Sequence, residues 1–136
     1  MEFRIEVLTL PVSDVDRAVS FYSSAGFALD ADYRPRAGFR VVQMTPPGSG
    51  ASVQFGVGVS DAPVGSARNN YLVVSDVEAA RRELVGRGVL VSPVRHKASV
   101  DWQGDWLPGV DPDRRPYATV VDFEDPDGNR WIVQER

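Results

Sequence analysis

Apolar and polar positions follow the same pattern twice along the chain. The run Val12-Ser13-Asp14-Val15 returns as Val74-Ser75-Asp76-Val77, 62 residues later. Gly26 and Gly88 follow where a left-handed residue commonly ends a helix. Between these points apolar residues keep the spacing of one helix face, at Val15, Ala18, Val19 and Tyr22 in the first copy and at Val77, Ala80 and Leu84 in the second. The pattern predicts a duplicated unit with one amphipathic helix in each copy.

Each predicted helix begins with a capping signal. Ser13 and Ser75 are the predicted N-caps, because a serine hydroxyl can accept a hydrogen bond from a free amide of the first turn. Asp16 and Glu78 stand three positions later, where a carboxylate can reach back to the N–H of the cap.

Alternating apolar positions and turn residues predict four strands in each half. The strands are expected over residues 3–10, 27–33, 39–44, 52–56, 70–74, 89–94, 117–123 and 130–134. Each half therefore reads as βαβββ, with module one over about residues 1–58, a linker over 59–68 and module two over about 69–136. A chain of 136 residues is one domain by size, so the two modules are expected to share a core.

The second half contains an insertion within residues 97–115. The two hairpin turns, at Pro46 and Asp125, are spaced 17 residues further apart than the repeat requires. Loops of this length without regular structure are uncommon and often bind ligands, and disordered segments seldom carry two tryptophans. Trp102 and Trp106 therefore favour a flap folded over the domain. The two tryptophans either close on a ligand, pin the loop onto the barrel or fill a dimer interface.

Composition narrows the class of partner. The net charge is −4 and basic residues form no extended cluster, which argues against nucleic acid. No apolar run reaches the length of a membrane span, no secretion signal is visible, and there is no cysteine. We expect a soluble cytoplasmic protein whose partners are small molecules or proteins.

The doubled βαβββ pattern resembles the vicinal oxygen chelate superfamily, which includes glyoxalases, bleomycin-binding proteins and extradiol dioxygenases. The resemblance covers the whole chain and is carried by the paired Val-Ser-Asp-Val helix starts, by Phe21-Tyr22 followed by Gly26-Phe27, and by Asp125-Pro126-Asp127-Gly128-Asn129. It implies an α+β fold in which the two modules form an incomplete eight-stranded barrel around a concave site, often within a homodimer. It does not settle the chemistry, because the superfamily holds both metalloenzymes and metal-free binding proteins.

The resemblance also implies where a metal ion would be bound. Metal-dependent members use a His or similar group on each first strand and a Glu on each last strand, and the register of this chain places Val7, Asn69, Val53 and Ile132 there. None of these side chains is a good metal ligand, and shifting the register by one residue recovers at best Glu6, Gln54 and Asn70. We expect no metal ligands and no cofactor.

Other polar residues carry weaker signals. His96, the only histidine, is the candidate general base, although no acidic partner is visible in the sequence and a solvated histidine is the simpler interpretation. Asp122 and Glu124 share a strand face and would suit acid–base work if buried, whereas beside a turn a solvated face is favoured. Arg40, Arg114 and Arg115 could hold an anion, with surface ion pairing as the default.

The leading hypothesis is a metal-independent small-molecule-binding protein that binds an apolar or aromatic metabolite or antibiotic. Its expected ligand-binding residues are Val7, Val53, Gln54, Asn69, Trp102, Trp106 and Ile132, with His96 at the edge of the site. The alternative is a glyoxalase-like lyase or isomerase with an unusual metal site or with acid–base catalysis by His96 and a carboxylate. A third reading is a module that serves in protein pairing.

Overall fold

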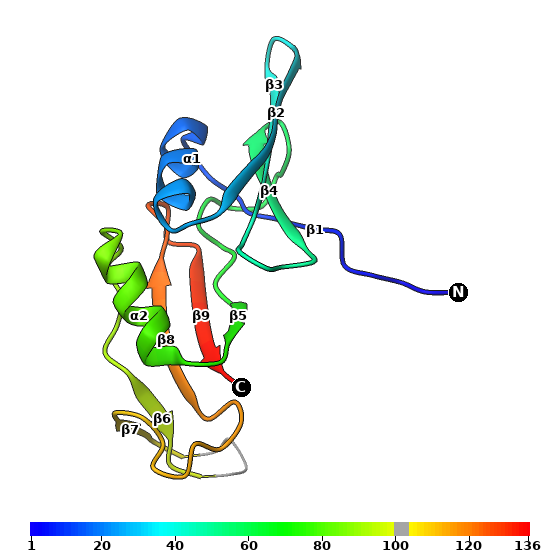
Figure 1. Cartoon of the computed structure of the whole chain (residues 1–136). Helices are drawn as coiled ribbons and strands as arrows, with labels where there is room; N and C mark the ends of the chain where they lie inside the picture. Colours follow the sequence, from blue (N-terminus) through cyan, green and yellow to red (C-terminus); the bar gives the residue numbers. More distant parts are fainter. Residues whose placement is uncertain (100–103) are drawn as a thin grey trace. The chain divides into compact units, whose positions relative to one another are not determined.

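The chain forms two compact units, shown in the computed structural model of Figure 1, which describes residues 1–99 and 104–136. The first unit contains Met1–Arg68 together with Asp125–Asn129, and the second contains Asn69–Glu124 together with Arg130–Arg136. Residues 59–68, the predicted linker, thus belong to the first unit. Each unit is described separately below.

The first unit is a four-stranded sheet with one helix on its face. Strand order is β1-β4-β3-β2, with β1 and β4 parallel and the other pairs antiparallel. Helix α1 packs through Val15, Ala18 and Tyr22, which are buried together with the sheet residues Val42, Met44, Val53 and Phe55. The elements are β1 (Val7–Thr9), α1 (Val15–Ser24), β2 (Ala28–Arg36), β3 (Phe39–Thr45) and β4 (Ser52–Val57).

The second unit repeats this topology and adds one strand. Its sheet has the order β5-β9-β8-β6-β7, in which β5 and β9 are parallel and the other pairs antiparallel. Helix α2 contacts β8 and β9. The elements are β5 (Asn70–Val74), α2 (Val77–Gly86), β6 (Arg95–Lys97), β7 (Trp106–Pro108), β8 (Thr119–Glu124) and β9 (Arg130–Glu135).

The predicted α+β fold with two βαβββ modules is confirmed. The helices begin at Val15 and Val77, 62 residues apart as the repeat requires. Gly26 and Gly88 have φ angles of 99° and 88°, in the left-handed region that glycine adopts without strain. Within the described residues the strands form two sheets, where the resemblance implied one incomplete eight-stranded barrel. Neither helix, at 10 residues each, is long and apolar enough to cross a membrane.

The predicted helix caps are wrong by one residue. The N-caps are Asp14 and Asp76, whose carboxylates accept hydrogen bonds from the amides of Arg17 and Ala79 at 3.0 Å. Serine and aspartate are about equally good N-cap residues, so the sequence alone does not distinguish Ser13 from Asp14 as the cap. The hydroxyl of Ser13 instead donates to the Asp127 carboxylate at 2.5 Å.

Two predicted strands differ from the structure. The strand expected over 89–94 is irregular, and β6 begins only at Arg95. Ser92 still donates its N–H to the carbonyl of Asp122, but Pro93 has no N–H to continue the ladder. The strand expected over 3–10 is paired only from Val7 to Thr9, and the side chains of Phe3 and Ile5 are exposed.

A buried polar network holds the Asp125–Asn129 turn in the first unit. The carboxylate of Asp125 accepts hydrogen bonds from the hydroxyl of Tyr22 at 2.8 Å, from the amide N–H groups of Asp127 and Asn129, and from the side-chain amide of Asn129. The Asn129 side chain also donates to the carbonyl of Pro11 at 2.9 Å. Asp125 and Asn129 are both buried, so these bonds are shielded from water.

Candidate functional site

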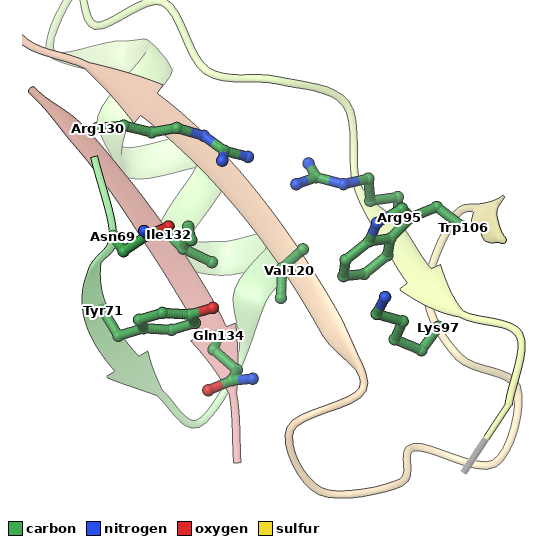
Figure 2. A pocket seen from close by; sticks show the side chains of 9 residues that line it. All are labelled: Asn69, Tyr71, Arg95, Lys97, Trp106, Val120, Arg130, Ile132 and Gln134. Carbon is green, nitrogen blue, oxygen red and sulfur yellow. The ribbon is translucent and has the colours of Figure 1, made fainter. Parts of the chain in front are cut away.

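A pocket of about 580 Å³ lies on the face of the second unit's sheet opposite α2. Side chains alternate across a strand, so one face of β8 and β9 carries the buried core of Thr119, Val121, Phe123, Trp131 and Val133, and the other face carries the pocket. The pocket is lined by residues from all five strands and from Asn69 just before β5: Asn69, Tyr71, Arg95, Lys97, Trp106, Val120, Arg130, Ile132 and Gln134 (Figure 2).

Pairing between β6 and β7 places an aromatic ring beside two cations. Trp106 lies directly opposite Lys97 in the antiparallel register. The Lys97 ammonium is 4.3 Å and the Arg95 guanidinium carbon 4.7 Å from the centroid of the Trp106 ring. Both contacts are within the range of cation–π attraction, which holds the ring at the edge of the pocket. Trp106 is 39% exposed, so much of its surface is open to a ligand.

A second charged cluster, which also includes Arg95, joins β6, β8 and β9 beside the pocket. The carboxylate of Asp122 accepts hydrogen bonds from Arg95 and from Arg130, both at 2.8 Å. Burial, the largest influence on this carboxyl group, raises its pKa, but hydrogen bonds from Ser92, Arg95 and Arg130 together lower the pKa to about 2. Asp122 is therefore ionised at neutral pH and holds the two arginines in place.

Asp122 should make stability depend on pH in the acid range. Its pKa is about 2 in the folded chain and ordinarily near 4 when unfolded, so its stabilisation is present above about pH 4 and is lost as the pH falls toward about 2. Because 20% of the side chain is exposed, we expect about 1 kcal/mol after solvent screening. Urea titrations should show that the difference in the free energy of unfolding between wild type and Asp122→Asn falls by about 1 kcal/mol between about pH 4 and about pH 2. A constant gap would contradict the assignment.

Three of the predicted ligand-binding residues come together in this pocket. Asn69, Trp106 and Ile132 all line it, whereas Trp102 lies outside the described residues. The sequence interpretation missed Tyr71 and the three cations. Strand side chains alternate between faces, so Arg95 and Lys97 share one face of a strand and His96 lies on the other. This alternation is the sequence signal that could have identified Arg95 and Lys97.

His96 points away from the pocket. It lies between Arg95 and Lys97 on β6, so its side chain occupies the opposite face of the strand, where it is 6% exposed. Its Nδ1 atom is 2.8 Å from the carbonyl oxygen of Gly109, which orients the ring. This position makes His96 part of the packing between β6 and the inserted segment, and we leave it out of the candidate site.

The remaining predicted residues belong to the first unit. Val53 is 3% exposed and packs on the α1 side of β4, so it does not reach the other face of its sheet. Gln54, the next residue, is the first-unit equivalent of Ile132. Gln54 pairs with Thr9 between β1 and β4, and Ile132 pairs with Tyr71 between β5 and β9. The Gln54 side-chain amide donates to the Thr9 hydroxyl at 2.9 Å, and Val7 on β1 is half-buried.

The arginines considered for anion binding have structural partners instead. Arg40 forms ion pairs with Asp32 and Asp16 at 2.8 Å, which raises the pKa of the guanidinium further above its ordinary value. The other two are paired as well, Arg114 with Glu135 and Glu78, and Arg115 with Asp111.

The side chains at the superfamily's metal-binding positions do not fit a divalent metal ion. Valine and isoleucine donate no electron pair, and an asparagine or glutamine amide is a weak ligand by itself. Over residues 1–99 and 104–136, no three His, Cys, Asp or Glu side chains gather in a group that could hold such an ion. We therefore derive no chemical step through a metal.

Comparison with known proteins defines the class. The model of the Glyoxalase/Bleomycin resistance protein/Dioxygenase superfamily matches residues 4–133. The chain belongs to this superfamily, as its βαβββ repeat and the resemblance of its motifs had indicated. A comparison with curated proteins finds no matching sequence.

Solved structures share the fold over nearly the whole chain. A glyoxalase/bleomycin resistance protein from Streptomyces sp. CB03234 is 29% identical, with a TM-score of 0.69 over 97% of this chain and 100% of that one. TnmS3, described as an antibiotic binding protein from Streptomyces sp. CB03234, is also 29% identical, with a TM-score of 0.71 over 98% and 96% of the two chains. A superfamily member from Sphaerobacter thermophilus DSM 20745, 24% identical with a TM-score of 0.70 over 99% and 98%, shows the same fold.

Proposed function

We propose that this chain is a small-molecule-binding protein that holds an aromatic metabolite or antibiotic in the pocket of its second unit, without the usual catalytic metal. The observation that carries the proposal is the pocket lining, in which the rings of Trp106 and Tyr71 and the apolar side chains of Val120 and Ile132 stand among a few polar groups. Apolar and aromatic walls with a few convergent polar groups are typical of ligand sites.

One similar structure supports a binding role. The antibiotic-binding description of TnmS3, which shares 29% of its residues with this chain, concerns that protein and makes a binding role a reasonable model for this one. The superfamily resemblance also supports a homodimer, and the proposal keeps the cytoplasmic location expected from the sequence.

The two acid–base groups considered for a lyase or isomerase, His96 and a carboxylate, do not suit this pocket. His96 faces the other side of β6, and a carboxylate with a pKa of about 2, such as Asp122, is a weak base at neutral pH. The candidate site therefore favours binding.

Two measurements on the purified wild-type chain test the proposal. Elemental analysis after purification without added metal should find far less than one equivalent of any transition metal. Isothermal titration should show anthracene-2-carboxamide binding at one site per chain, before and after dialysis against a chelator, with a rise in melting temperature on binding. Near-stoichiometric metal together with chelator-sensitive binding would refute the metal-free proposal, and failure of this probe to bind would refute the aromatic pocket.

A further inference from the structure

We propose that this pocket selects an anionic ligand, a planar aromatic molecule carrying a carboxylate or an acidic hydroxyl, and that Lys97 receives the negative group. The inference rests on the proposed function, because it names the ligand class for the same pocket. It extends that function from ring binding to charge selection.

The pocket has an excess of positive charge. Three of its lining residues are cationic, Arg95, Lys97 and Arg130, and within the described residues none of those that line it carries a carboxylate. Asp122 neutralises part of this charge from the adjoining sheet surface, since both arginines donate to it. One carboxylate between two guanidinium groups leaves a net positive cluster even before Lys97 is counted.

Lys97 is the cation most available to a ligand. In the part of the chain that the structure describes, no carboxylate lies within ion-pairing distance of its ammonium group, which instead rests 4.3 Å from the centroid of the Trp106 ring. Lys97 is half-buried and lies among the residues that line the pocket. A charge-assisted hydrogen bond is stronger than an exposed cation–π contact, so an arriving anion offers the ammonium group the stronger partner.

The arrangement of side chains suits a flat ring with an acidic group at one edge. Figure 2 shows Tyr71, Ile132 and Gln134 on one side of Val120 and Trp106 with Lys97 on the other. A planar ligand over Val120 would therefore meet an aromatic side chain at each end. A carboxylate on the end nearest Trp106 would lie beside the Lys97 ammonium, because these two residues are opposite one another in the β6–β7 register.

A series of probes with one ring system and three charges tests the inference. Anthracene-2-carboxylate, anthracene-2-carboxamide and anthracene-2-methylammonium should be titrated into the wild-type chain by calorimetry. The carboxylate should bind about tenfold more tightly than the amide, and the ammonium more weakly than both, because only the carboxylate forms a charge-assisted bond with Lys97. This preference should fall as salt is raised.

Substitutions assign the preference to a particular cation. Lys97→Met should bring the carboxylate-to-amide ratio close to one, and Lys97→Arg should keep most of it. Arg82→Met, which removes an exposed positive charge from α2 in the same unit, should leave the ratio unchanged and so controls for net charge. Melting temperatures of all variants establish that each is folded.

Lys97 is the only lysine of the chain, which permits a test on unmodified protein. Brief acetylation followed by peptide mass spectrometry should show that anthracene-2-carboxylate slows the reaction of Lys97 while the amino group of Met1 reacts at its usual rate. Unchanged reactivity of Lys97 at saturating carboxylate would overturn its assigned role.

The outcomes separate this inference from the proposed function. Equal binding of all three probes, or tighter binding of the ammonium, overturns charge selection and leaves the aromatic pocket standing. If none of the three probes binds, the pocket itself is refuted, and the inference is refuted with it. Carboxylate preference that survives Lys97→Met refutes the assignment to Lys97.

Discussion

Asp125→Ala should lower the free energy of unfolding by about 3–5 kcal/mol, because it leaves several buried hydrogen-bond donors without an acceptor, each at a cost of about 1–3 kcal/mol. The Asp125 carboxylate is 5% exposed and accepts hydrogen bonds from the Tyr22 hydroxyl and from two groups of Asn129. Without it these donors stay buried with no acceptor and carry a desolvation cost. Urea denaturation followed by far-ultraviolet circular dichroism measures the change.

Two further variants show whether this loss comes from the network. Asp61→Ala removes an exposed carboxylate from the same unit and should change stability by less than about 0.5 kcal/mol. Tyr22→Phe removes a single donor and keeps the ring, which packs 5.1 Å from Phe27 and 5.8 Å from Phe55 between ring centroids, so about 1 kcal/mol is expected. A loss below about 1 kcal/mol for Asp125→Ala would show that the network contributes little to stability.

Trp106→Ala should weaken binding of anthracene-2-carboxamide by about 30-fold, equivalent to the 2 kcal/mol or more expected of an aromatic anchor. The substitution removes an aromatic wall of the pocket and also the ring over which Arg95 and Lys97 are held. A neutral probe is chosen so that the result reports on the ring and not on charge. Calorimetric titration provides the dissociation constants.

Leu107→Ala is the matched control for this variant. Leu107 is the next residue of β7, is 45% exposed, and faces the opposite side of the strand, where it pairs with His96. Its truncation should leave probe affinity within about twofold, because surface substitutions away from a site have small effects. If Trp106→Ala lowers affinity less than threefold, or if Leu107→Ala lowers it as much, the pocket does not form the binding site that we propose.

The helices and the repeat were predictable because their signals are local. The spacing of Val15, Ala18 and Tyr22 defines a buried helix face, and glycine at 26 and 88 follows from a backbone conformation that other residues rarely adopt. The strand before β6 was mispredicted for a reason that is also local. Pro93 has no N–H to donate to the hydrogen-bond ladder, so the strand begins only after it, at Arg95.

The candidate site was predicted only in part, because a shift of one residue moves a strand side chain to the other face of the sheet. Asn69, Trp106 and Ile132 were predicted and line the pocket, whereas Arg95 and Lys97, which flank the predicted His96 on β6, were not predicted. The face of the sheet that each strand residue occupies depends on the register, and residue type gives little information about it when polar and apolar residues alternate irregularly.

The sequence by itself determined the class of this protein: a duplicated βαβββ chain of the glyoxalase and bleomycin-resistance superfamily, with side chains unsuited to hold a metal ion at that superfamily's usual positions. The tertiary structure alone decided which charged residues join Asn69, Trp106 and Ile132 in the pocket. Trp106 meets Lys97 through the β6–β7 register, and Arg130 reaches Arg95 across Asp122 through the order β9-β8-β6. The physical reason is that helix periodicity and turn chemistry are encoded over a few neighbouring residues. The charge of this pocket depends instead on pairings between strands up to 35 residues apart, from Arg95 to Arg130.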